Sequence, residues 1–499
     1  MKNNKRQAIV IIHGIGEQRP MKTLRGFVSS LLNYEKSDHA ELNPGHESKV
    51  SDRNFWTKPD RISNSYELRK ITAKGEKNVR STTHFYEYHW ASNMRDNKTK
   101  HVWQWLKPII WRGTTNTDLR VATLTYFLRL LIIAYPILCL FILLSLDNKL
   151  EFKWWFLFLG LPFSILPIRK FIKSYAADAA RYFQPNNDNI AQREVIRQNG
   201  INLIRALHKT EDYDRIVLVG HSLGSVIAYD IITYLWIEFN KSINLNQGHN
   251  LVYRSKCKWG ISFGNVNEES EQLKNLNDIT YLINQYDSEG HKIDSEGFHN
   301  KLQANKTHIN KGVETDGRDE HKDSIEHLRK DFQHAQSEMW KAVSHKRKGW
   351  LISDLVTIGS PLTHANLLMA DSEFDFKLRI DEREYPTCPP QVDDGKYTYG
   401  NDDGDKFIHH ATPFVATRWT NLYYQSDLVG GKVAKRFGNA IVDRKINHPS
   451  WFRNYFPNTH NAYWAKNSNP DNIKTTSEYE SIRQLYKAIR LNDIEEGLY

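Results

Sequence analysis

One segment of the chain constrains the fold more than any other, because a strand, a sharp turn and a helix follow one another without a gap. Residues 215–219 (RIVLV) form a short β-branched run, residues 220–224 read GHSLG, and residues 225–239 are almost continuously apolar. A G-x-S-x-G turn between strand and helix lifts the serine hydroxyl out of the sheet, and its small glycines let neighbouring backbone pass. The segment therefore predicts a buried strand that ends at a nucleophilic serine, Ser222.

Other apolar runs of strand length are spaced along the chain. They are residues 8–12 (AIVII), 84–90 (HFYEYHW), 351–358 (LISDLVTI) and 419–424 (WTNLYY). Helix-like segments separate them, and residues 477–489 read as a closing helix. Strands that alternate with helices indicate an α/β fold, with a mainly parallel sheet and helices on both faces.

A nucleophilic serine needs backbone donors for the negative charge that develops on its substrate. One is the N–H of Leu223, the residue after the nucleophile. The second is expected from the loop that follows the strand at residues 8–12, which reads HGIG. Glycines there let amides approach the substrate, so we expect Gly14 to line this site and the N–H of Ile15 to donate. His13 is expected to orient the loop.

The carboxylate of such a site follows the serine in the chain, ahead of the histidine. Asp427 comes just past the strand at residues 419–424, where this acid belongs. An aspartate in that position also forms turns, and Asp443 is a second candidate.

The general base is expected to be His460, which lies late in the chain in a polar loop and is followed by aromatic residues that can fix its ring. His448 is an alternative. His409 and His410 precede Asp427 and fit the order poorly. Ser360, in a Gly-Ser-Pro turn without a following helix start, is read as structural.

Two uncharged runs interrupt the α/β pattern at residues 130–146 and 154–168. Tryptophans flank them, arginines and lysines lie on their outer sides, and the connecting loop is net neutral. The pattern predicts a membrane hairpin with both chain ends in the cytoplasm, either spanning or re-entrant. A pair of buried core helices is the alternative.

The overall composition excludes several classes of protein. Charged residues make up 25% and aromatic residues 12% of the chain, which excludes wholesale disorder. The excess of 68 Lys and Arg over 58 Asp and Glu favours an anionic partner. Because part of this charge flanks the hairpin, a lipid surface is expected and nucleic acid is not. Three cysteines form no CxxC pair, so reduced thiols are expected, with no zinc site and no cofactor.

The motifs together resemble serine esterases and lipases of the α/β-hydrolase superfamily, of the bacterial membrane-associated type. They are VIIHGIGEQ, YEYHWA, RIVLVGHSLGSVIAYD, LVTIGSPLTHA, RWTNLYYQSDLVGG and THNAYW, which extend from near residue 8 to residue 464. The resemblance implies an α/β-hydrolase fold in which Ser222, Asp427 and His460 form the catalytic triad.

The expected organisation is a hydrolase core with two insertions. Residues 1–120 hold the oxyanion loop, residues 121–173 the hairpin, residues 174–264 the nucleophile, residues 265–350 a polar insertion read as a lid or an interaction surface, and residues 351–499 the acid and the histidine.

The expected function is hydrolysis of lipid or phospholipid acyl esters at the cytoplasmic membrane, with membrane lipids as anchor and substrate. A deacylase or thioesterase acting on membrane-tethered acyl groups, and a non-catalytic membrane scaffold, are the alternatives. The sequence leaves protein partners unknown.

Overall fold

The computed structural model describes most of the chain in sixteen stretches. They are residues 5–15, 19–42, 55–63, 65–75, 81–94, 99–112, 119–144, 177–210, 212–240, 271–286, 325–344, 349–391, 397–400, 406–447, 457–464 and 476–491.

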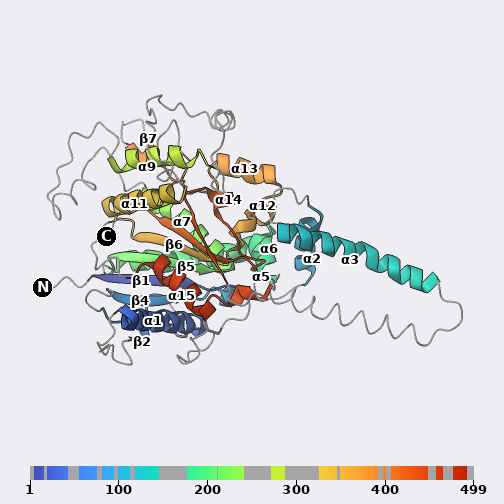
Figure 1. Cartoon of the computed structure of the whole chain (residues 1–499), viewed down its shortest axis with the longest axis horizontal. Helices are drawn as coiled ribbons and strands as arrows, with labels where there is room; N and C mark the ends of the chain where they lie inside the picture. Colours follow the sequence, from blue (N-terminus) through green and yellow to red (C-terminus); the bar gives the residue numbers. More distant parts are fainter. Residues whose placement is uncertain are drawn as a thin grey trace.

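One eight-stranded sheet organises the molecule, in the order β10-β9-β6-β5-β1-β4-β3-β2 (Figure 1). Its strands are β1 (Arg6–Ile12), β2 (Phe55–Pro59), β3 (Arg69–Ala73), β4 (Thr82–Tyr88), β5 (Arg215–His221), β6 (Ile352–Ile358), β9 (Arg418–Tyr424) and β10 (Val442–Ile446). All pairs from β10 to β4 are parallel, and only β3 and β2 are antiparallel. This confirms the predicted α/β class and the mainly parallel sheet.

The central strands are covered by helices on both faces, so the side chains on both of their faces are buried. All residues of β5, β6 and β9 are buried. One face packs against α1 (Lys22–Leu42) and α15 (Thr476–Ile489), and the other against α6 (Asn187–Lys209), α7 (Leu223–Asn240) and α11 (Ile325–Val343). Figure 1 shows these two helical layers on opposite sides of the sheet.

The polar stretch 265–350 contributes to the core where the structure describes it. It contains α9 (Glu271–Ile283) and α11, which pack against each other. Phe332, Met339 and Trp340 of α11 are buried in the main apolar cluster. The Gln336 amide donates to the carbonyls of Phe414 and Thr417, at 2.6 and 3.0 Å. The described helix α11 is thus part of the layer over the sheet, and not a surface insertion.

Shorter elements join the layers. They are the helices α12 (Ala365–Leu368), α13 (Glu373–Asp381) and α14 (Ala434–Phe437), the 3₁₀ turns η1 (Ala91–Asn93), η3 (Pro361–His364), η4 (Pro413–Val415) and η6 (Pro457–Asn461), and a small hairpin of β7 (Thr398–Gly400) and β8 (Lys406–Ile408).

A helical arm extends from the carboxyl end of the sheet. Residues 130–144 of the first predicted apolar run lie in the second helix of this arm. α2 (Thr99–Trp111) follows β4 and η1 and packs against α5 (Ala177–Phe183), and α3 (Leu119–Leu144) extends away from the body (Figure 1). Arg129 of α3 donates to the carbonyls of Ile110 and Arg112.

Crossing a membrane takes a helix of sufficient length and apolarity, and none is found among the residues described here. The second predicted run, residues 154–168, lies outside those residues, so the hairpin stays a prediction.

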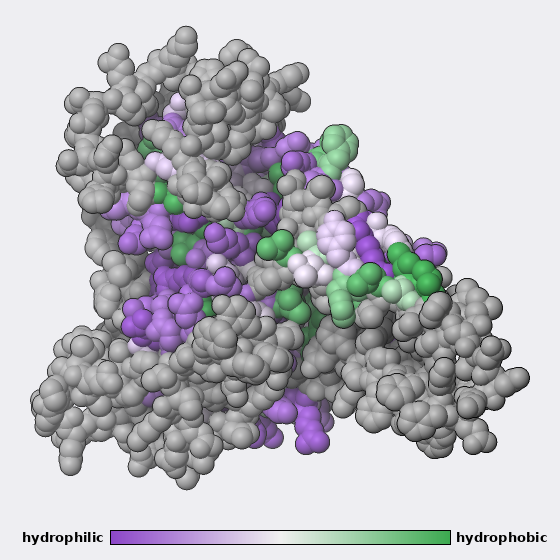
Figure 2. All heavy atoms as spheres, turned by 45° about the vertical axis from the view of Figure 1, so that its right-hand side comes forward, coloured by the Kyte–Doolittle hydropathy of each residue, from purple (hydrophilic) through white to green (hydrophobic). Residues whose placement is uncertain are grey.

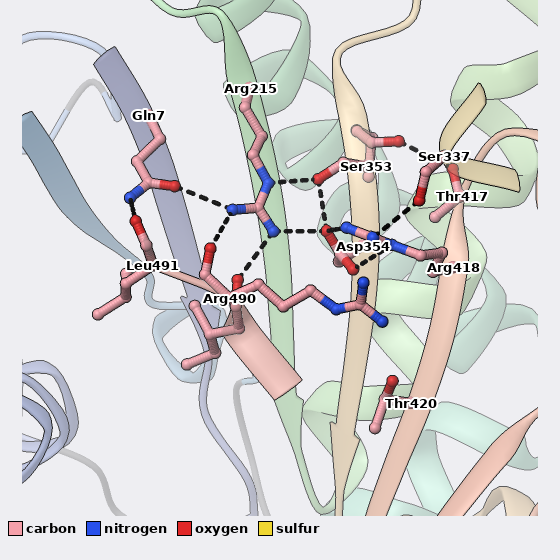
Figure 3. A network of polar contacts seen from close by, with 12 residues as sticks. Gln7, Arg215, Ser337, Ser353, Asp354, Thr417, Arg418, Thr420, Arg490 and Leu491 are labelled. Carbon is pink, nitrogen blue, oxygen red and sulfur yellow. Dashed lines mark hydrogen bonds and ion pairs between the residues drawn. The ribbon is translucent and has the colours of Figure 1, made fainter. Parts of the chain in front are cut away.

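The amino end of the sheet holds a buried ionic network (Figure 3). The Asp354 carboxylate pairs with the guanidinium groups of Arg215, at 2.6 Å, and Arg418, at 2.9 Å. Burial alone would raise the pKa of Asp354, but these two cations hold it well below its usual range. Arg215 also donates to the carbonyls of Ile489 and Arg490 at the end of α15. The network therefore fastens the last helix to the starts of β5, β6 and β9.

Candidate active site

Ser222 lies at the sharp turn between β5 and α7, at the carboxyl end of the sheet. Its φ is +53°, a left-handed conformation that is strained for a residue with a side chain. Its N–H donates to the carbonyl of Ile358 at 2.9 Å, and its own carbonyl accepts from the N–H of Ser225. These bonds to β6 and α7 hold the serine in the strained geometry.

Two flanking glycines permit this turn because no side chain fits beside them. A Cβ at Gly220 would overlap the backbone of Gly224 and Ser225. A Cβ at Gly224 would overlap the carbonyl oxygen of Ile12 and lie 2.5 Å from that of His13. The G-x-S-x-G glycines therefore let α7 begin directly against the end of β1.

His460 connects the serine to a carboxylate. Its Nε2 lies 2.8 Å from Ser222 Oγ, and its Nδ1 lies 3.0 and 2.9 Å from the two carboxylate oxygens of Asp427. A carboxylate only accepts hydrogen bonds, so Nδ1 carries the proton and Nε2 accepts from the serine hydroxyl. The side chain of Asp427 is fully buried, and that of His460 is 13% exposed.

The environment of Asp427 keeps the carboxylate ionised. Burial on its own raises the pKa of this carboxyl group, but hydrogen bonds from His460, Tyr463 and backbone N–H groups lower the pKa to about 2. The Tyr463 hydroxyl donates to Oδ2 and the Val429 N–H donates to Oδ1, both at 2.8 Å. Gly359, with a φ of +55°, passes close by; a Cβ there would lie 2.9 Å from Oδ2.

The predicted oxyanion loop lies directly beside Ser222. A Cβ at Gly14 would approach Ser222 Cβ to 2.7 Å, so only glycine allows this proximity. The His13 Nδ1–H donates to the Gly14 carbonyl at 2.8 Å, and its ring stacks on Trp90 at 5.1 Å. Burial lowers the pKa of His13 to about 3, so the ring is neutral, and its bond to the Gly14 carbonyl is compatible with the predicted role of orienting the loop.

The arrangement of this loop is compatible with the two predicted donors, the N–H groups of Ile15 and Leu223. In a trans peptide the C=O and N–H point in opposite directions, so a bond that holds the Gly14 carbonyl toward His13 directs the Ile15 N–H away from it. Leu223 is the first residue of α7, and the first four N–H groups of a helix have no partner within that helix. The N–H groups of Ile15 and Leu223 therefore stay the predicted donors to a substrate oxygen.

The alternative candidates have other contacts. The Asp443 carboxylate accepts from the N–H groups of Val433 and Ala434, each at 3.0 Å, and from Asn421. His409 contacts Arg383 near the β7–β8 hairpin. His448 lies outside the described residues.

Ser360 accepts from Ser225 Oγ at 2.6 Å and from the Leu362 N–H, as a turn residue does.

Two side chains of the site were not singled out from the sequence. Tyr463 donates a hydrogen bond to the Asp427 carboxylate, and the sequence indicated it only as one of the aromatic residues that follow His460. His221, the variable residue inside G-x-S-x-G, contacts His460; nothing in its spacing distinguishes it from an ordinary strand residue.

The site contains no arrangement of metal ligands in the part of the chain that the structure describes, where no group of three or more His, Cys, Asp or Glu side chains is placed to hold a metal ion. Comparison with known proteins gives no further guidance, because no family model, curated protein or solved structure matches the chain.

Proposed function

We propose that the protein is a serine hydrolase of the α/β-hydrolase type that cleaves carboxylic esters. One observation carries the proposal: a serine, a histidine and a buried carboxylate, far apart in the sequence, are joined in line by hydrogen bonds of 2.8 to 3.0 Å. Serine nucleophile, base and orienting acid are the three roles that acyl transfer requires.

In the first half of the reaction, Ser222 Oγ attacks the ester carbonyl carbon and its proton passes to His460 Nε2. Asp427, ionised and bonded to Nδ1–H, stabilises the imidazolium that forms. The tetrahedral intermediate then collapses, the bond to the alcohol oxygen breaks, and His460 gives its proton to the leaving alcohol. The acyl group remains on the serine.

In the second half, water attacks the acyl-enzyme. His460 takes one proton from the water, the bond from the acyl carbon to Ser222 Oγ breaks, and the same proton returns to the serine. The carboxylic acid leaves and the free enzyme is restored, so the cycle consumes one water and needs no other reactant.

The oxyanion of both tetrahedral intermediates would accept from the Leu223 and Ile15 N–H groups. Such a donor typically contributes about 3–4 kcal/mol to transition-state stabilisation. The fixed peptide planes around Gly14 support this assignment, because donors that are oriented beforehand cost no reorganisation during the reaction.

The helical arm supports a lipid substrate. Five apolar side chains on α3 form a stripe at spacings of seven, four, three and four residues, and each is more than half exposed: Leu119, Tyr126, Leu130, Ile133 and Ile137. Figure 2, with this end turned forward, shows apolar side chains gathered on this side of the molecule. An exposed apolar surface of this kind suits a bilayer interface.

The arm is also attached near the proposed catalytic site. Arg112, which directly follows α2, donates to the carbonyls of Leu367 and Ala370, and the segment that carries these carbonyls follows the end of β6. His364 from the same segment contacts the carbonyl of Leu428, next to Asp427. An arm in contact with lipid would therefore bring the catalytic end of the sheet to the membrane surface.

We accordingly favour membrane-associated hydrolysis of lipid or phospholipid acyl esters at the cytoplasmic membrane. A deacylase or thioesterase acting on membrane-tethered acyl groups would use the same acyl-enzyme. A non-catalytic membrane scaffold is the remaining alternative, and the complete Ser, His and Asp set argues against it.

Purified protein incubated with mixed phospholipid vesicles tests the reaction, with released fatty acids and lysolipids measured by mass spectrometry. Wild type should release them and Ser222→Ala should not. Products from an S-acylated peptide in place of those from phospholipid would favour the thioesterase alternative, and equal activity of the two proteins would refute the nucleophile.

Vesicle sedimentation tests the arm. The double variant Leu130→Glu, Ile133→Glu should bind anionic vesicles less than wild type, because it places charge in the apolar stripe. Phe55→Glu, Trp56→Glu on the exposed edge strand β2 is the matched control and should bind as wild type does. Equal binding by all three proteins would contradict the role of the stripe.

A further inference from the structure

His221 lies between the nucleophile and the base but has no part in the proton transfers. It is the last residue of β5 and directly precedes Ser222. Its side chain points toward the segment that carries His460, which comes from a distant part of the chain. Two separate contacts join these two histidines.

The first contact is a hydrogen bond to the backbone of the base. Nε2 of His221 lies 3.0 Å from the carbonyl oxygen of His460, so Nε2 carries a proton and donates. That carbonyl belongs to η6, a turn of only five residues. Because the turn is short, a hydrogen bond to its backbone fixes the position of the His460 main chain, from which the imidazole side chain extends.

The second contact is between the rings. The imidazoles of His221 and His460 stack, with their centroids 5.1 Å apart and an angle of 27° between them. Trp464 packs edge-on against His221 at 4.8 Å, and Tyr463 does so at 5.9 Å. The His221 ring therefore occupies a defined position among aromatic groups, against which the base is held.

The charge state of His221 suits this position. Burial lowers its pKa to about 3, with the nearby His460 adding to the effect. The His221 ring is therefore neutral near neutral pH, and because Nε2 carries the proton it presents one tautomer. A second positive charge beside the imidazolium formed at His460 would oppose its formation.

We infer that His221 is a positioning residue for His460: its Nε2–H anchors the carbonyl of the base and its ring supports the imidazole face, so that Nε2 of His460 stays in line with Ser222 Oγ. This inference rests on the proposed function, and it adds a fourth side chain to the three that carry out the reaction.

Two substitutions separate the two contacts, and a third serves as the control. His221→Gln keeps a side-chain N–H donor near the position of Nε2 and removes the ring, whereas His221→Phe keeps a ring and removes the donor. His208→Gln is the matched control, because His208 is also buried, neutral, hydrogen-bonded to a carbonyl and packed against aromatic rings, but lies near the start of β6.

The experiment measures kcat and KM on a soluble short-chain ester, the rate of labelling by a fluorophosphonate, and the thermal unfolding midpoint of each variant. We expect His221→Phe to lower kcat and the labelling rate by about 10- to 100-fold with KM within twofold, which is the scale of a small displacement of a catalytic group. His221→Gln should recover most of this loss, to within about fivefold of wild type. His208→Gln should lower the midpoint and leave kcat per folded molecule unchanged.

Wild-type kcat in folded His221→Phe would overturn the inference. So would a decrease in kcat that, in all three variants, is fully explained by a smaller fraction of folded protein. Absence of labelling and turnover in the wild type would instead refute the proposed function, and the inference with it.

Discussion

Substitution of Gly224 by alanine tests whether the close contact between α7 and the oxyanion loop is needed for catalysis. An added Cβ would overlap the Ile12 carbonyl oxygen and lie 2.5 Å from that of His13. An ordinary van der Waals contact begins at 3.4 Å, so the His13 oxygen must move by about 0.9 Å and the Ile12 oxygen by more. The atoms that have to move are backbone at the end of β1, next to Gly14. A displacement of about 1 Å in a catalytic group can cost about 100-fold in rate.

The cost in stability should be smaller than the cost in rate. Overpacking typically destabilises a protein by about 1–3 kcal/mol. Alanine recovers about 1 kcal/mol, because glycine is a poor helix former and Gly224 lies in the first turn of α7. We therefore expect Gly224→Ala to fold, with kcat reduced about 100-fold.

The assay compares ester turnover and urea unfolding of Gly224→Ala with those of Gly200→Ala. Gly200 lies in α6, where a Cβ would meet the side chains of Ile231 and Tyr88 and no part of the oxyanion loop. Gly200→Ala should keep the wild-type kcat. Wild-type turnover by a folded Gly224→Ala protein would show that the close contact between α7 and the oxyanion loop is not needed for catalysis.

Four further outcomes are expected. Asp427→Asn should lower kcat by about 10⁴-fold at neutral pH while the protein stays folded, because an amide no longer sets the histidine tautomer. The pKa of Asp427 in the folded protein, about 2, lies below its ordinary value, so the ionised carboxylate should add about 2 kcal/mol to the free energy of unfolding above pH 4. This contribution should be lost as the pH falls through 2, and urea unfolding measured from pH 7 downward would record the loss. Tyr463→Phe should lower kcat about 3- to 10-fold and the free energy of unfolding by about 1 kcal/mol, measured by steady-state kinetics and denaturation. Asp354→Asn should lower the free energy of unfolding by about 3–5 kcal/mol, since it leaves Arg215 and Arg418 buried without their carboxylate, yet kcat per folded molecule should not change.

The nucleophile turn could be predicted because its geometry is local. The strand, the glycines and the helix that surround Ser222 are contiguous, so their sequence contains the whole constraint. The acid and the base could be ranked only by chain order and by their immediate neighbours, since Ser222 and His460 are 238 residues apart. Their proximity depends on strand order in the sheet, which no local pattern encodes.

The role of α11 was not evident from the sequence because its buried face includes polar residues. Gln336 is fully buried, and its amide nitrogen donates to two backbone carbonyls. A hydropathy pattern nevertheless counts a glutamine as a surface residue. The edge strand β2 was also missed; its residues FWTKP are all exposed and show no alternation. The burial of α11 depends on partners about 80 residues away, whereas β2 pairs with the neighbouring strand β3 at the edge of the sheet.

The supporting contacts of the site were the least predictable. A histidine at the position of His221 is compatible with any buried strand, and only the fold places its ring against His460. Gly359 and Gly430 likewise pass close to Asp427 from different loops, and their glycine requirement becomes visible only in three dimensions.

The proposed reaction requires above all that Ser222 is a nucleophile. Incubation with a fluorophosphonate, followed by intact mass measurement and peptide mapping, tests this. We expect one adduct per chain, located on the peptide that contains Ser222, together with loss of ester turnover and no adduct in Ser222→Ala. No adduct on the wild type, or equal labelling of wild type and Ser222→Ala, would contradict the account.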